Sequence, residues 1–317
     1  MMPAIVGRNI LRELNGVCCI YKPSLVSKHY ILDKFRTQLC KDANEKYQRP
    51  PVDILDINND EGEITVKLRP SYMDNVLVSG PRFVKDDMSL AVSPLSSKAS
   101  GVCAMGINYG ITDLNKLMKY NPMKVYQIKG VLGVATQFLF KDQKVVARVK
   151  VKNAHMNTME KILSSFQSSH HRKAFFSLGI DMQSQKAYEL ACQGMLKPYS
   201  KDTPFIYSIK CIEFDAPNFT IEVKCMNDTE DYLLRLIYEI GLKFRTVAHC
   251  TGIRCIRYGP FTVKDSLIPQ EWTLQTIKHN IRNCEPLLRY VFENARKDFL
   301  QPVNDSESHS PLEVASK

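Results

Sequence analysis

The sequence lacks the patterns that mark disulfide-rich, zinc-binding and membrane-spanning proteins. Its ten cysteines include no C-x-x-C pair, and its seven histidines follow no metal-ligand spacing. No apolar run reaches the roughly 18 residues that a membrane span needs, and no secretory signal or internal repeat is recognisable. We therefore expect free, buried thiols in a reducing compartment, no metal site and no membrane contact. The adjacent pair His170-His171 is predicted to lie on the surface.

Positive charge, in contrast, is in excess. The 317 residues include 43 Lys and Arg against 33 Asp and Glu, a formal net charge of +10. A basic balance of this kind favours a polyanionic partner, most simply nucleic acid. Hydrophobic residues make up 44% and charged residues 24% of the chain, which is enough apolar material for a buried core. The length suits one large domain or two modest ones.

The first 14 residues form a short segment of their own. Arg8 and Arg12 accompany an apolar stripe that includes Ile10 and Leu11, and Glu13 is the single acid. This amphipathic pattern is typical of a mitochondrial presequence and also of a structural lead-in helix, and the sequence leaves both open. We expect a mitochondrial location, with the cytoplasm or nucleus as the alternative.

Composition divides the rest of the chain. Residues 15–300 are predicted to form one folded domain, and the polar tail, 301–317, to be disordered. Residues 41–63 are polar and contain Pro50-Pro51, which predicts a surface insertion. Apolar periodicity predicts strands near 17–21, 64–68, 124–132, 145–151, 205–213 and 219–225, and helices near 28–39, 154–168, 185–194, 229–241 and after residue 272. Because these elements mix without a regular βαβ alternation, the predicted fold class is α+β.

Six short motifs occur in a fixed order along the chain. They are Asn15-Gly16 with Tyr21-Lys22-Pro23, Leu95 to Gly106, Lys124-Val125-Tyr126, Ala187-Tyr188-Glu189-Leu190-Ala191, Val223-Lys224-Cys225, and Gly259-Pro260-Phe261-Thr262. In this order they resemble the TruB family of pseudouridine synthases, and within it the second animal paralogue, which is linked to mitochondrial RNA. One such match would be weak, but six in order across residues 15–266 are specific.

The resemblance implies a fold, a partner and a chemistry. The fold is a mixed, mainly antiparallel central sheet flanked by helices, with the active cleft across the sheet face. Enzymes of this family detach uracil from its ribose, turn it and rejoin it through carbon. They use an aspartate nucleophile, an arginine that pairs with it, and a tyrosine that stacks on the extruded base. Tyr126 holds that tyrosine's position, although a strand-core aromatic gives the same pattern. RNA is the implied partner (tRNA, or mitochondrial mRNA or rRNA), with no metal or organic cofactor, and we expect a monomer.

Five cations are predicted to contact RNA. Lys22 and Lys124 match family lysines near the cleft, and Lys98 lies in the loop of the nucleophile. Arg172 and Lys173 belong to a short cationic cluster after the predicted 154–168 helix, which would meet phosphate or simply end a solvated helix.

The nucleophile position departs from the family pattern. The loop that has Leu-Asp in the family has Leu95-Ser96 here. An aspartate is ionised at neutral pH, with a reference pKa of about 3.9, whereas a serine hydroxyl is a weak nucleophile until a neighbouring base removes its proton. Residues 90–100 contain no His, Asp or Glu, and Ser93-Pro94 replaces the paralogue's His-Arg pair. The loop itself therefore supplies no base for Ser96.

The arginine position departs as well. Alignment on Cys225 and Gly241 places Leu234 at the family arginine, with Arg235 one residue later. At about 100° per residue, Leu234 lies on the flank of the buried helix stripe and Arg235 nearly opposite, so we expect Arg235 to face solvent. A buried arginine without its carboxylate partner would be a costly unpaired charge. Loss of the aspartate and the arginine together is the pattern expected when selection no longer maintains catalysis.

Three functions follow from these residues. The first is an RNA-binding protein on a TruB-type scaffold whose isomerase activity is lost. The second is an active synthase on tRNA or mitochondrial mRNA that uses another carboxylate, with Asp86-Asp87 nearest in sequence. The third is a scaffold in an organellar ribonucleoprotein assembly, whose protein partners would contact residues 41–63 or the tail.

Overall fold

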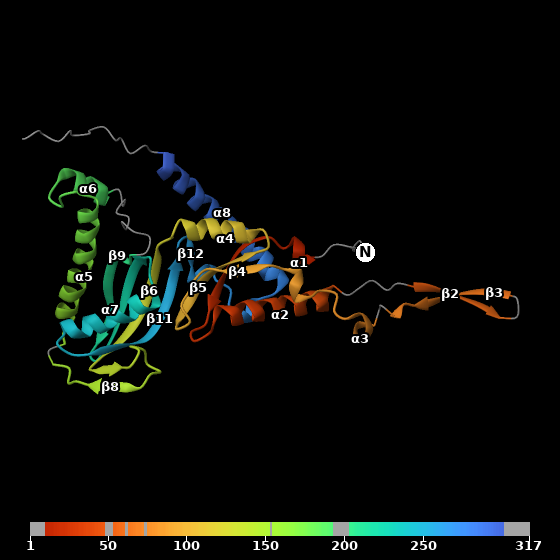
Figure 1. Ribbon diagram of the computed structural model, residues 1–317, viewed down its shortest axis with the longest axis horizontal. Helices are drawn as coiled ribbons and strands as arrows, with labels where there is room; N and C mark the ends of the chain where they lie inside the picture. Colours follow the sequence, from red (N-terminus) through yellow and green to blue (C-terminus); the bar gives the residue numbers. More distant parts are fainter. Residues whose placement is uncertain are drawn as a thin grey trace, which may run out of the picture.

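An eight-stranded sheet organises the chain (Figure 1). The structure is a computed structural model that describes residues 10–47, 53–60, 63–72, 75–152, 154–192 and 203–300. The helices are α1 (Ile10–Glu13), α2 (Lys28–Lys46), α3 (Val76–Ser79), α4 (Gly110–Lys119), α5 (Met156–Ser177), α6 (Gln185–Cys192), α7 (Glu230–Lys243) and α8 (Leu274–Leu300). The strands are β1 (Gly16–Lys22), β2 (Asp53–Asp60), β3 (Glu63–Pro70), β4 (Leu90–Val92), β5 (Ala99–Ile107), β6 (Lys124–Leu132), β7 (Val134–Thr136), β8 (Val145–Arg148), β9 (Phe205–Asp215), β10 (Asn218–Met226), β11 (Ala248–Tyr258) and β12 (Phe261–Thr262).

The sheet is mixed but mainly antiparallel, as the resemblance implied. Its strands lie in the order β1-β5-β11-β6-β10-β9, with β4 on β5 and β12 on β11. Within the described residues, the pairings between the strands of this sheet are antiparallel except that of β5 with β11, which is parallel. Gly101 lies at this parallel junction with φ +123°, and a Cβ there would overlap the carbonyl oxygen of Cys255. Glycine therefore lets the loop before β5 enter the middle of the sheet.

Two apolar cores lie on opposite faces of the β1–β5 end. Successive strand residues point to opposite faces, so Cys19 and Ala104 join the core under α4, α5 and α7, while Cys18 and Cys103 join the core under α1 and α2. On β6 and β11, the residues that alternate with the α7-side core are Gln127, Lys129 and Arg254, which are half-buried or exposed. This part of the sheet keeps a polar, accessible face.

Several expected elements have different ends. Strand β6 has the predicted bounds, 124–132, but the strand expected over 145–151 ends at Arg148. Helix α5 continues to Ser177 instead of ending near 168, because Ala174 and Phe175 resume the buried stripe after a polar stretch. The first residues of the expected insertion, 41–46, complete α2, where Ala43 is buried.

The remaining part of the expected insertion forms a hairpin. Strand β2 pairs with β3 from Asp53↔Pro70 to Asp60↔Glu63, in a two-stranded sheet separate from the main one. Figure 1 shows this hairpin projecting away from the sheet. Within the described ranges, no helix is both long and apolar enough to cross a membrane. Residues 1–9, the expected helix stop at Gly194 and the tail 301–317 lie outside the described residues.

Candidate active site

A pocket of about 730 Å³ opens where the loop before β5, the start of β6 and the beginning of α7 meet. The loop contributes Ser96, β6 contributes Lys124 and Tyr126, and the chain entering α7 contributes Asp228 and Glu230. The position of the family nucleophile and that of the stacking tyrosine therefore line one cavity. Two carboxylates face the same space.

A buried lysine holds the loop in place. Lys22 ends β1 with only 3% of its surface exposed, and its ammonium donates to the carbonyl oxygens of Pro23 (3.1 Å), Ser97 (3.2 Å) and Ala99 (2.8 Å). Burial lowers the pKa of Lys22. Leu25 adds a backbone hydrogen bond to the Ser97 carbonyl at 2.8 Å. We expected Lys22 to contact RNA, but its ammonium points into the protein and binds the loop backbone.

Ser96 and Lys98 both contact Glu230. The Ser96 hydroxyl donates to Glu230 Oε2 and accepts the backbone N–H of Lys98 at 3.2 Å. The Lys98 ammonium lies 2.8 Å from Glu230 Oε1. Burial alone would raise the pKa of Glu230, but hydrogen bonds from Lys98 and Ser96, together with the Lys98 charge, hold this pKa below its ordinary value. Glu230 is therefore a stable carboxylate that two residues of the loop approach.

Asp228 forms a second polar cluster in the pocket. The Tyr126 hydroxyl donates to Asp228 Oδ2 at 2.6 Å, and the Lys124 ammonium lies 3.1 Å from Asp228 Oδ1. Tyr126 is 1% exposed and its ring packs in the apolar core. Burial, with nearby negative groups, raises the pKa of Tyr126 well above its ordinary value, so it remains a donor. Lys124 is also buried, which places it with Asp228 instead of on the solvated surface.

The residue at the family arginine position lies in the core. Leu234 is buried in α7 beside the stripe formed by Leu233, Leu236 and Ile237. Arg235, one residue later, is exposed. The expectation that Arg235 faces solvent is confirmed. The described pocket thus receives no arginine from α7.

The other expected RNA contacts are on α5, away from the pocket lining. Arg172 and Lys173 are exposed there. The neighbouring histidines are not a surface pair, so that prediction was wrong. His170 Nε2 lies 2.8 Å from the Tyr232 hydroxyl of α7, and His171 Nε2 lies 3.0 Å from the Tyr207 carbonyl oxygen of β9. Both rings are half-buried because α5 packs against these elements.

Sequence reasoning did not predict the two carboxylates of the pocket, Asp228 and Glu230. Asp86 and Asp87 do not line it, and Asp87 is instead ion-paired with Arg12 at 3.2 Å. The available signal was the capping segment before α7, where Thr229 accepts from the Tyr232 N–H and acidic residues flank it. Acids are also common at a helix N-terminus for their favourable charge, so this signal does not by itself indicate a pocket. Across the described ranges, no three His, Cys, Asp or Glu side chains come together as a metal site.

Comparison with known proteins identifies the family. The model of the TruB family pseudouridylate synthase (N terminal domain) matches residues 94–230, which include Ser96 and Glu230. The mitochondrial pseudouridylate synthase TRUB2 of Xenopus tropicalis is 36% identical over 288 residues, covering 87% of this chain and 87% of the relative. The chain belongs to the TruB family of pseudouridylate synthases.

A second TruB relative agrees with this placement. The mitochondrial pseudouridylate synthase TRUB2 of Homo sapiens is 30% identical over 300 residues, covering 92% of this chain and 90% of the relative. Among solved structures, the chain is similar to the crystal structure of the archaeal box H/ACA sRNP Nop10-Cbf5 complex. The TM-score is 0.46 at 15% identity, and the match covers 87% of this chain and 61% of that chain.

Proposed function

We propose that the chain is an RNA-binding member of the TruB family that does not isomerise uridine. The observation that carries this proposal is the reversed polarity of the pocket. In the family pattern the loop supplies an aspartate and the helix supplies an arginine. Here the loop supplies Ser96 and Lys98, and the helix supplies Glu230, 2.8 Å from the Lys98 ammonium.

The chemistry around Ser96 supports the loss of activity. A serine becomes a nucleophile when a base takes its proton. Glu230 is the group that Ser96 contacts, and a carboxylate whose pKa is held below its ordinary value is a weak base. The Lys98 ammonium is ion-paired with the same Glu230 carboxylate. The hydroxyl therefore stays protonated and serves as a hydrogen-bond donor.

The basic character of the chain supports RNA binding. The net charge is +10, and Arg172 and Lys173 project from α5 into solvent. Lys22 and Lys124 would act indirectly in this proposal, because each is buried against protein partners that shape the pocket. Stacking of a base on Tyr126 would require the groups that cover its ring to move aside. The RNA would be a tRNA or a mitochondrial mRNA or rRNA.

Two measurements on the purified full-length chain test the proposal. An RNA stem-loop containing a target uridine is expected to bind with an affinity that falls as salt rises, because phosphate contacts release counterions. The same RNA, incubated with the protein and analysed by mass spectrometry after carbodiimide labelling of pseudouridine, is expected to contain none. Pseudouridine formed at a specific site would overturn the proposal.

A second candidate is an active synthase that uses Asp228. The observation in its favour is that Asp228 lines the same pocket as Ser96 and contacts both Tyr126 and Lys124. If the wild type forms pseudouridine, Asp228→Asn would abolish it by orders of magnitude on this mechanism. Glu230→Gln, at the neighbouring carboxylate, is the matched control that should retain it.

A scaffold role is the third candidate, and the projecting hairpin favours it. Leu55 and Leu68 pair across β2 and β3 and are 62% and 71% exposed, so this arm offers apolar surface to a protein partner. Partners that stay bound after nuclease treatment, and that are lost when the hairpin is removed, would favour this role over RNA binding.

We also propose a mitochondrial location. It is supported by the TRUB2 relatives of Xenopus tropicalis and Homo sapiens, which are named as mitochondrial proteins. A fusion of the full chain to a fluorescent protein should co-localise with a mitochondrial marker, and a cytoplasmic or nuclear signal would contradict this.

A further inference from the structure

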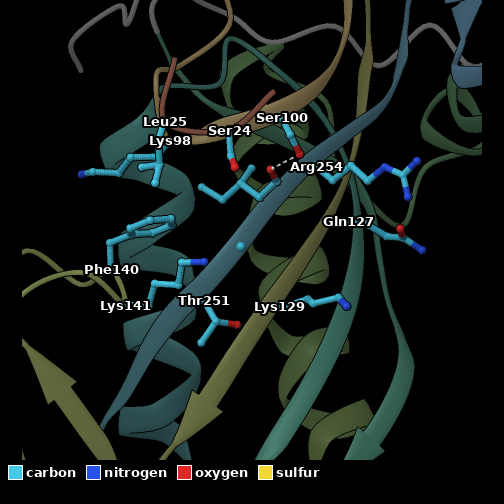
Figure 2. A pocket seen from close by; sticks show the side chains of 12 residues that line it. Ser24, Leu25, Lys98, Ser100, Gln127, Lys129, Phe140, Lys141, Thr251 and Arg254 are labelled. Atoms are coloured by element: carbon cyan, nitrogen blue, oxygen red, sulfur yellow. Dashed lines mark hydrogen bonds between the residues drawn. The ribbon is translucent and has the colours of Figure 1, made fainter. Parts of the chain in front are cut away.

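A second pocket, of about 250 Å³, lies on the open face of the sheet (Figure 2). It is lined from β6 by Lys129, from β11 by Thr251 and Arg254, and from the segment after β7 by Lys141. Lys98 also lines it, but its ammonium is paired with Glu230 of the first pocket. The two pockets are therefore neighbours on either side of the loop that carries Ser96.

The charge of this second pocket is uniformly positive. Lys129, Lys141 and Arg254 are exposed, and no Asp or Glu lines the pocket. Within the described part of the chain, none of these three cations lies within ion-pair distance of a carboxylate. Figure 2 shows Lys129 and Lys141 on opposite sides of β11, with Thr251 between them. Like charges held around one space favour an anion there.

Side-chain hydroxyls and a stretch of backbone that no described side chain covers complete the pocket. The hydroxyls of Ser24, Ser100 and Thr251 line it, and that of Ser100 donates to the Ile253 carbonyl oxygen at 3.3 Å (Figure 2). Gly252 lies where a register shift interrupts the pairing of β11 with β6. A Cβ built on Gly252 meets no heavy atom within 4 Å, so a ligand can approach the backbone closely.

We propose that this pocket binds a phosphate group of the RNA chain, at a point separate from the uridine pocket. The inference rests on the proposed RNA binding and names where one backbone contact is made. Lysine, arginine and hydroxyl donors suit phosphate oxygens. At about 250 Å³ the cavity is smaller than the roughly 300–1,000 Å³ of pockets for drug-sized ligands, which fits one phosphate. Its exposed cations leave room for a chain to continue on both sides.

The first test removes charge from the pocket. Lys129→Ala combined with Lys141→Ala is compared with Lys161→Ala combined with Lys278→Ala, two exposed lysines outside it. Both double variants lose the same charge, and within the described residues none of these four side chains forms a hydrogen bond or an ion pair. For a fluorescent RNA stem-loop at 0.1 M salt, the pocket variant should bind about tenfold more weakly or worse. Its plot of log affinity against log salt should become shallower by about 0.7, the change expected when one single-stranded phosphate contact is lost.

The second test fills the pocket. Gly252→Glu adds a carboxylate where the structure has open space, so the fold should tolerate it, and thermal unfolding checks that it does. It should weaken RNA binding at least as much as the double lysine variant. Gly252→Ala, which adds only a methyl group, should change binding less than threefold.

The outcomes separate this inference from the proposed function. Wild type that binds no RNA overturns the proposed function and this inference with it. Wild type that binds RNA while the pocket variants bind equally well, or while the control variant loses as much, overturns this inference alone. Inorganic phosphate is titrated by calorimetry as the last arm. If it binds the wild type tightly, Gly252→Glu abolishes that binding and RNA affinity is unchanged in every variant, the ligand is free phosphate and the assignment to RNA is wrong.

Discussion

At the scale of single residues, Lys22 shows how a cation can serve the fold instead of a ligand. Its three acceptors are all backbone carbonyl oxygens, and two belong to the segment that leads from the pocket loop into β5. Lys22→Ala would leave those buried acceptors without a donor. We expect it to lower the free energy of unfolding by about 2–4 kcal/mol, measured by urea denaturation.

The control for Lys22 is a lysine without such partners. Lys34→Ala, on the exposed side of α2, should change the free energy of unfolding by less than about 0.5 kcal/mol. Equal losses in the two variants would mean that the carbonyl contacts of Lys22 contribute nothing measurable.

The cysteines are predicted to differ sharply in reactivity. Cys192 on α6 is exposed, while Cys103 and Cys250 are buried and burial raises the pKa of each to about 12. Because the thiolate is the reactive form, iodoacetamide at pH 8 should modify Cys192 first, as read by mass spectrometry of peptides. In concentrated urea all ten cysteines should react at similar rates. Modification of Cys103 before Cys192 in the folded protein would contradict the structure.

At the scale of elements, the contact between α5 and α7 should make stability depend on pH. Burial, with the charges of Lys173 and His171, lowers the pKa of His170 to about 4 from an ordinary value near 6.5. Below about pH 6.5 the unfolded chain therefore takes up a proton that the folded chain does not. The contribution of His170 to the free energy of unfolding is therefore fully present above that pH and is lost as the pH drops towards 4.

The loss assigned to His170 should reach about 1–2 kcal/mol once the partial exposure of the ring is allowed for. The measurement is denaturation of the wild type and His170→Gln between pH 7 and 4, since the difference between them removes the titration of other groups. His29→Gln, at an exposed position in α2, is the control and should follow the wild type. Parallel curves for wild type and His170→Gln would disprove this contribution.

Elements were predictable where local pattern and motif agree. Strand β6 has the expected bounds because its alternation coincides with the Lys-x-Tyr motif. The resemblance assigned Ser96 and Tyr126 to one site, and both line the same pocket. Glu230 was not, because its contact with Ser96 joins residues 134 apart in sequence. A sequence shows which residues begin a helix but not which loop that helix end approaches, and Lys22 was misjudged for the same reason.

At the scale of the whole molecule, the β2–β3 hairpin is an appendage to the two cores. Its strands pair with each other, outside the main sheet, and an isolated hairpin is marginally stable in water. Replacement of residues 53–70 by a short Gly-Ser linker should therefore change the free energy of unfolding by less than about 1 kcal/mol. Leu39→Ala, within the core under α2, is the contrasting variant and should cost about 2–5 kcal/mol. A hairpin deletion as costly as Leu39→Ala would show that the arm packs on the body.

The contact between Ser96 and Glu230 also bears on the mutational paths open to this protein. Ser96→Asp alone would set a second carboxylate against Glu230, and one of the two would be driven to hold a proton, which makes a poor nucleophile. Leu234→Arg alone would bury a guanidinium in an apolar core. Each single step toward the family's arrangement is thus worse than the starting point. A change from this pocket to the family's Asp and Arg arrangement therefore requires paired substitutions, because each single substitution is unfavourable on its own.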